Sequence, residues 1–182
     1  MFEGKPLELG YEKTLRVKIL TPKTAKDALN LQGNEIIIAS AGSEDVNRAL
    51  FENKNMDIVM NLELSGKEDG MHYRNSGLNQ VLCKLAAEHG IAICFNIQHM
   101  KSSRVLGRMM QNVKLCRKYK VQMKIASFAS NSYEMKGASN VLSLAKVLGM
   151  THPEALNAMS FSELLTEKKV KKPRKGVKIL ED

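Results

Sequence analysis

Short apolar runs alternate along this chain with longer segments in which apolar residues recur every three or four positions. A run that is apolar at successive positions is typical of a strand covered on both faces, as in a parallel sheet. The runs predict five strands and a short late one, at residues 15–20, 35–39, 57–61, 91–95, 121–126 and 177–180.

The intervening segments carry helix signals. Thr21-Pro22 places a capping residue before a first-turn proline, and Ser43 precedes two acids suited to a helix N-terminus. Ser76 can cap a helix whose buried face is predicted to comprise Leu78, Val81, Leu82, Leu85 and Ala86. The longest helix is predicted at 103–119. Three shorter ones are predicted at 139–148, 153–157 and 160–165, the second with a Thr-x-Pro start.

Strands that alternate with helices predict an α/β fold with a parallel sheet and right-handed crossovers. We expect one domain over residues 1–166 and a basic C-terminal tail over 167–182 that includes the late strand. Periodicity does not decide between an open sheet and a closed barrel. An eight-fold barrel usually needs about 250 residues, so this chain is short for one.

The net charge of +9 is concentrated near the C-terminus. Six of the positive charges belong to Lys168, Lys169, Lys171, Lys172, Arg174 and Lys175, and without them the chain would carry +3. This favours a polyanionic partner, nucleic acid rather than membrane, because no basic helix has an aromatic face. The chain has no tryptophan and few other aromatic residues, which favours phosphate or shape contacts over base stacking.

The cysteine pattern and the chain start indicate the compartment. Cys83, Cys94 and Cys116 lie in helical or strand patterns without a Cys-x-x-Cys pair, so we expect buried thiols. No apolar run is long enough to cross a bilayer, and the first residues lack the regions of a secretory signal. A cytoplasmic protein is therefore expected.

One stretch is similar to a known family. Arg74-Asn75-Ser76-Gly77-Leu78-Asn79-Gln80, its helix and the strand Ile91-Ala92-Ile93-Cys94-Phe95 resemble the signature of the archaeal and eukaryotic RNase P protein component 3 family. This is the thirty-kilodalton protein subunit of the ribonucleoprotein that processes tRNA 5′ ends. The similarity extends over residues 46–180 and includes Asn47-Arg48-Ala49-Leu50, Ser103-Arg104-Val105-Leu106 and Pro173-Arg174-Lys175-Gly176 in the family's order.

The resemblance implies a TIM-barrel-like fold related to the polymerase-and-histidinol-phosphatase phosphoesterases. Relatives begin with an extra βα portion that is not found before Leu15. Either the barrel is incomplete at the N-terminus, or residues 1–10 replace that portion.

The implied function is that of a non-catalytic protein subunit of ribonuclease P, in which RNA catalyses removal of the 5′ leader from precursor tRNA. The implied partners are RNase P RNA, RNase P protein component 2 and other protein subunits, with precursor tRNA contacted indirectly. Magnesium is expected for the RNA-catalysed reaction, and no cofactor is expected on this chain.

The chain departs from the family pattern at positions where catalytic or metal-binding acids would be expected. Asn75, Cys94 and Phe128 stand where many relatives carry acids, near strand ends at which barrels hold catalytic groups. We therefore predict no catalytic and no metal-binding residue. An alternative is a metal-dependent phosphoesterase of the related superfamily, and another is a small-molecule βα enzyme. The best residual ligand cluster is Glu63, Glu68, Asp69 and His72, which is otherwise a solvated polar loop.

Residues expected to contact RNA or a protein partner fall in three segments. Arg104, Arg108 and Lys118 are predicted opposite the apolar face of the long helix, either as a phosphate-contacting ridge or as an ordinary solvated face. Arg74, Ser76 and Asn79 lie in the loop with the family signature, where Ser76 could instead only cap a helix. The six basic tail residues form the third segment.

Replacing the six basic tail residues with glutamine is predicted to lower RNA affinity and flatten its salt dependence, because fewer counterions are released. RNA titrations at several salt concentrations measure both. An unchanged slope would remove the tail from the contacts.

Overall fold

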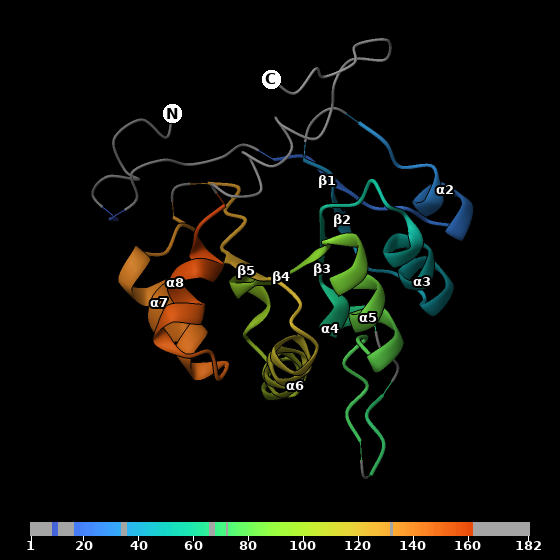
Figure 1. The fold of residues 1–182 in the computed structure, drawn as a ribbon. Coiled ribbons are helices and arrows are strands. Elements are labelled where there is room, and N and C mark those ends of the chain that lie inside the picture. The colour runs from blue at the N-terminus through green and yellow to red at the C-terminus, as the bar shows by residue number, and fades with distance from the viewer. Residues whose placement is uncertain are drawn as a thin grey trace, which may run out of the picture.

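The computed structural model describes residues 9–10, 17–33, 36–65, 68–71, 73–131 and 133–161. Its strands form one parallel sheet whose spatial order equals their order in the chain (Figure 1). The strands are β1 (Ile19–Leu20), β2 (Ile38–Ser40), β3 (Ile58–Met60), β4 (Ala92–Asn96) and β5 (Met123–Ala126). The α/β class and all five principal strands are thus confirmed.

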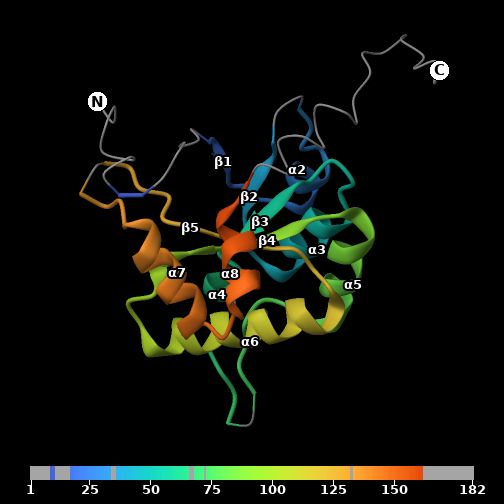
Figure 2. The same cartoon turned by 60° about the vertical axis from the view of Figure 1, so that its left-hand side comes forward.

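Helices follow the strands and lie along one side of the sheet (Figures 1 and 2). Right-handed crossovers between successive neighbouring strands place each connection on the same face. The helices are α2 (Ala25–Leu29), α3 (Glu44–Glu52), α4 (Leu62–Ser65), α5 (Gln80–His89), α6 (Ser103–Tyr119), α7 (Ala138–Val147) and α8 (His152–Met159), with a 3₁₀ turn η1 (Ile97–His99). Within the described part, no helix has the length and apolarity to cross a membrane.

The sheet separates two apolar clusters. In β4, Ile93 and Phe95 pack into the large core beneath the helices. Ala92 and Cys94 face the opposite way and join a smaller cluster with residues of β2 and β3. Both faces of β4 are therefore covered, which explains its continuous apolar sequence. All three cysteines are buried free thiols, as expected.

Several helices begin where a cap is available, which is not always where the sequence pattern places it. Ser43 caps α3 as predicted. For α2 the prediction at Thr21-Pro22 is wrong, because Thr24 and Asp27 form a reciprocal capping box. Thr151 forms the same box with Glu154 at the start of α8. The 103–119 helix is confirmed with its predicted bounds.

A buried lysine joins β5 to the end of α8. Lys124 is fully buried, and its Nζ donates to the carbonyl oxygens of Ser160 at 2.6 Å and Asn157 at 3.2 Å. A cation is favourable at a helix C-terminus, where carbonyl groups lack intrahelical partners. Lys124 therefore holds the end of α8 against the last described strand.

Some predictions fall beyond the described residues. They are the late strand at 177–180, the tail, most of the predicted 160–165 helix and most of residues 1–10. Ser160 and Phe161, where that helix was expected to begin, are not helical.

Gly77 allows α4 and the start of α5 to approach closely. Its φ is +73°, and an added Cβ would overlap the Leu62 carbonyl oxygen and lie 2.7 Å from Ser65 Oγ. Gly90, at the end of α5, has a similar φ of +69° but open space around it. The two glycines thus share a backbone conformation and differ in what surrounds them.

Gly77→Ala is predicted to lower the free energy of unfolding by about 3 kcal/mol, from left-handed strain plus overpacking. Gly90→Ala should cost only the strain, about 1 kcal/mol. Urea denaturation of both variants measures the difference. Equal losses would show that Gly77 is needed for its φ alone.

Candidate nucleic-acid interface

A protruding loop between α4 and α5 is held against α6 by an ion pair between a buried arginine and a partly exposed aspartate. We call this loop the finger and define it as residues 68–71 and 73–75. Arg108 of α6 is 3% exposed, and its Nη2 lies 2.7 Å from Asp69 Oδ1 in the finger. The Arg108 Nε donates to the same oxygen at 2.8 Å, and the Asn75 amide donates to it at 2.9 Å. These hydrogen bonds lower the pKa of Asp69, that from Arg108 most.

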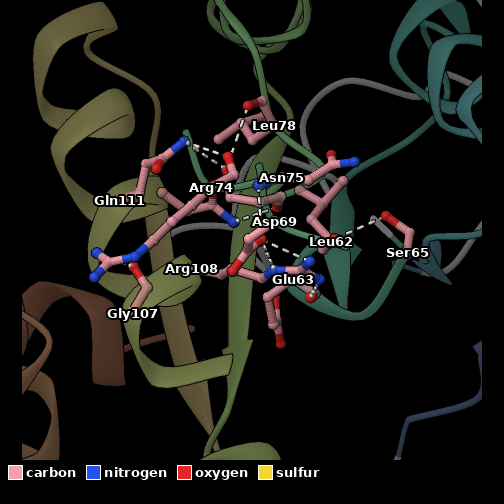
Figure 3. A network of polar contacts seen from close by, with 12 residues as sticks. Leu62, Glu63, Ser65, Asp69, Arg74, Asn75, Leu78, Gly107, Arg108 and Gln111 are labelled. Atoms are coloured by element: carbon pink, nitrogen blue, oxygen red, sulfur yellow. Dashed lines mark hydrogen bonds and ion pairs between the residues drawn. The ribbon is translucent and has the colours of Figure 1, made fainter. Parts of the chain in front are cut away.

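Further side chains of α6 satisfy the backbone where the finger returns to the body (Figure 3). Gln111 Nε2 donates to the Arg74 carbonyl at 3.1 Å and to Ser76 Oγ at 3.2 Å. Asn112 Nδ2 donates to the Ser76 carbonyl at 3.0 Å, and Arg108 Nη1 donates to the Glu63 carbonyl at 3.0 Å. The carbonyls of the buried residues Ser76 and Glu63 thereby keep hydrogen-bond partners.

This arrangement corrects two site predictions. Arg108 was expected on an exposed face of α6, but it is buried because Asp69 and the Glu63 carbonyl surround its guanidinium. Ser76 was expected to cap α5, but it is buried and Asn79 is the cap, accepting from the Leu82 amide at 2.9 Å. The left-handed φ of Gly77 prevents a helix from starting at Ser76. Asn79 remains exposed.

The exposed face of α6 is basic. Arg104, Lys114 and Lys118 are exposed, and none of them forms an ion pair within the described part of the chain. The Arg74 guanidinium lies over Gly107, where an added Cβ would be 3.0 Å from Arg74 Cζ. Arg74 Nη1 contacts the Gly107 carbonyl oxygen at 3.4 Å. We call Arg74, Arg104, Lys114 and Lys118 the basic ridge. The six tail residues predicted for RNA contact lie outside the described residues.

A second set of polar side chains lies near the carboxyl ends of β3 and β4. Glu63 is buried in α4, and its Oε1 lies 4.0 Å from His99 Nδ1 in η1. Among the described residues, neither atom has a hydrogen-bond partner, nor does Asn61 Oδ1. Burial raises the pKa of Glu63 to about 7 and lowers the pKa of His99, which Lys101 lowers further. Near neutral pH a proton on Glu63 allows this buried carboxyl to be uncharged.

The ligand cluster considered from sequence is not assembled as such. Asp69 pairs with Arg108, Glu68 is exposed, and His72 lies outside the described residues. Glu63 is directed instead to His99. Among the described side chains, no three His, Cys, Asp or Glu residues are grouped as a metal site.

The positions that depart from the family pattern are all near the finger or the strand ends. The backbone N–H of Asn75 donates a hydrogen bond to Asp69, and Cys94 is buried on β4. Phe128, two residues after β5, has a φ of +46° and packs on the smaller apolar cluster.

Sequence reasoning missed Gln111 and Asn112 as holders of the finger, and it missed the approach of buried Glu63 to His99. One signal was present for α6. Arg108 and Asn112 are one turn apart beside the apolar stripe of Met109, Val113 and Cys116, so a polar row borders the core. For Glu63 and His99 the chain offers no such spacing, because they come from different strand ends.

The chain is similar to known proteins in its sequence and in its fold. Residues 15–173 match the family described as RNase P subunit p30. The chain is 36% identical over 160 residues to Ribonuclease P protein component 3 of Methanosarcina acetivorans, covering 81% of this chain and 62% of that protein. Its counterpart in Methanosarcina barkeri is 33% identical over 188 residues, covering 98% and 73%.

A solved structure is also similar. One chain of a cryo-EM structure of archaeal ribonuclease P with mature tRNA superposes with a TM-score of 0.65 and 25% identity, covering 81% of this chain and 65% of that one. The sequence thus spans about three fifths of the M. acetivorans relative and about two thirds of the solved chain.

Glu63→Gln is predicted to change the pH dependence of stability. A carboxyl pKa raised from 4.5 to about 7 on folding gives stability that is present below pH 4.5 and lost as pH rises to about 7. The variant lacks this loss, so its stability relative to wild type should rise by about 3 kcal/mol across that window. Urea denaturation of both proteins at pH 5, 6, 7 and 8 measures the difference, in which the His99 contribution largely cancels. Parallel curves would contradict a raised Glu63 pKa.

Proposed function

Because this chain belongs to the RNase P subunit p30 family, we propose that it is a protein subunit of a ribonuclease P ribonucleoprotein. In this proposal it supports RNA-catalysed endonucleolytic removal of the 5′ leader from precursor tRNA. The observation that carries the proposal is the family match over residues 15–173. The similarity to a chain of archaeal ribonuclease P with mature tRNA supports it.

The basic ridge is the proposed RNA contact on the described residues. Arg74, Arg104, Lys114 and Lys118 offer positive charge with no acidic partner in the described part, and Arg74 and Arg104 can bind phosphate bidentately. Such contacts give affinity that carries little sequence information and weakens as salt rises. Asn79 and the six tail residues remain part of the proposal. Arg108 and Ser76 act instead by positioning the finger.

In this proposal the RNA catalyses the reaction, and magnesium is the metal that the reaction uses. The protein helps to fold and position the RNA. The proposed protein partners are RNase P protein component 2 and the other protein subunits, and the proposed location is the cytoplasm. We further propose a barrel-like architecture, since neighbouring strands in chain order with helices on one face are what a TIM-barrel segment has.

Reconstitution tests the function. The cognate RNase P RNA and the other protein subunits are assayed for precursor-tRNA cleavage with and without this chain. We expect cleavage to fall when the chain is omitted. Full cleavage without it would refute the proposal. Turnover of precursor tRNA or a simple phosphodiester by the chain alone would favour the phosphoesterase alternative.

A further inference from the structure

The finger presents large side chains to solvent. In both overall views it extends past α6, away from the sheet (Figures 1 and 2). Met71 is 93% exposed and Tyr73 is 68% exposed, although both are large and partly or wholly apolar. Large exposed side chains on a projecting loop are available for contact with a partner.

The finger is fixed at its base. The Asn75 backbone amide donates to Asp69, and Asp69 pairs with buried Arg108, so both sides of the finger are held at its base. At the tip the Tyr73 ring packs against Gly70, where an added Cβ would be 2.8 Å from Tyr73 Cδ1. The ring is thus supported by backbone on one part of its surface and open elsewhere. A side chain placed in advance loses less conformational entropy on binding.

The surroundings of Tyr73 are basic. Arg74 follows it directly and lies over α6 at Gly107, and Arg104 is close enough to lower the pKa of Asp69. The negative charge of Asp69 is neutralised by Arg108. Exposed Glu68 is the remaining acid of the described finger. An open aromatic ring beside arginines can stack on a base while the arginines contact the adjoining phosphates.

We propose that Tyr73 is a stacking platform for an unpaired base of RNA, with Arg74 and Arg104 contacting the flanking phosphates. This rests on the proposed function and adds the class of RNA that the finger binds, a single-stranded segment. Stacking on one ring tolerates any base, so the contact selects unpaired RNA without reading its sequence. Scarcity of aromatic residues argued against stacking from the sequence, but a single ring suffices where the fold projects it beside cations.

A single-stranded probe tests this directly. The full chain is titrated into a labelled uridine oligomer of about twelve nucleotides, and into an RNA duplex of about twelve base pairs, at several salt concentrations. Tyr73→Ala should weaken binding of the oligomer by about ten-fold and leave duplex binding unchanged. Its salt slope should equal that of wild type, because no phosphate contact is lost. Arg104→Gln should weaken binding of both RNAs and lower the slope for the oligomer by about 0.7.

Matched variants separate stacking from other effects of Tyr73. Tyr73→Phe keeps the ring and should bind like wild type, whereas Tyr73→Leu should bind as weakly as the alanine variant. Tyr133→Ala removes another highly exposed tyrosine, 89% exposed between β5 and α7, and should change nothing. Circular dichroism of each variant confirms an intact fold.

Three results with the RNA probes would overturn the proposal. They are wild-type binding by Tyr73→Leu, equal weakening of oligomer and duplex by Tyr73→Ala, and no binding of the oligomer by wild type. A Tyr73→Ala effect confined to association with the protein subunits would identify the tip as a protein contact and also reject stacking. Each of these leaves intact a requirement for the chain in precursor-tRNA cleavage, so failure of this inference is distinct from failure of the proposed function.

Discussion

The position of the finger depends on burying the Arg108 charge. A guanidinium withdrawn from water is costly unless it is paired and its remaining donors are satisfied, and here Asp69 and the Glu63 carbonyl do both. Because the partners come from the finger and from α4, the requirement fixes both segments to α6. Arg74 is then laid over Gly107, and the finger tip is placed beside the basic face of that helix. A partly buried pair of this kind is weak evidence for added net stability, whereas removing one partner would leave the other without its counter-charge.

The order of the strands in the sheet brings α4 and the finger next to α6. Strands added in chain order with right-handed crossovers place α5 and α6 on one face as neighbours, and both pack into the large core. The α4 helix and the finger leave the sheet at the carboxyl end of β3, so their polar groups meet α6 and the turn after β4. At the same end lie buried Glu63 and partly exposed His99, whose Oε1 and Nδ1 atoms are 4.0 Å apart. That end is therefore polar: Asp69 holds the finger there, whereas Glu63 Oε1 and His99 Nδ1 have no hydrogen-bond partner among the described residues.

Elements with strong local patterns were predictable, and contacts between distant elements were not. The five strands and the 103–119 helix followed from apolar spacing, and Ser43 from its capping chemistry. Helix α5 was predicted with the wrong cap, because Ser76 and Asn79 have the same local chemistry and only the close approach of Gly77 to Leu62 decides between them. Arg104 and Lys118 were correctly placed on the exposed face of α6. Arg108 was not, because its burial requires an acid thirty-nine residues away.

The amino-acid sequence by itself determined the α/β class, the parallel strands, the helical face of α6 and the family to which the chain belongs. These depend on residue periodicity, capping groups and ordered motifs, which are all local in the chain. Only the tertiary structure decided which charges face solvent, which are buried as pairs, and where the finger projects. A charged side chain is exposed or buried according to whether a partner reaches it, and the partner here is brought by the packing of α4 and the finger on α6. The same packing leaves Tyr73 exposed on the finger, next in the chain to Arg74, which lies over Gly107.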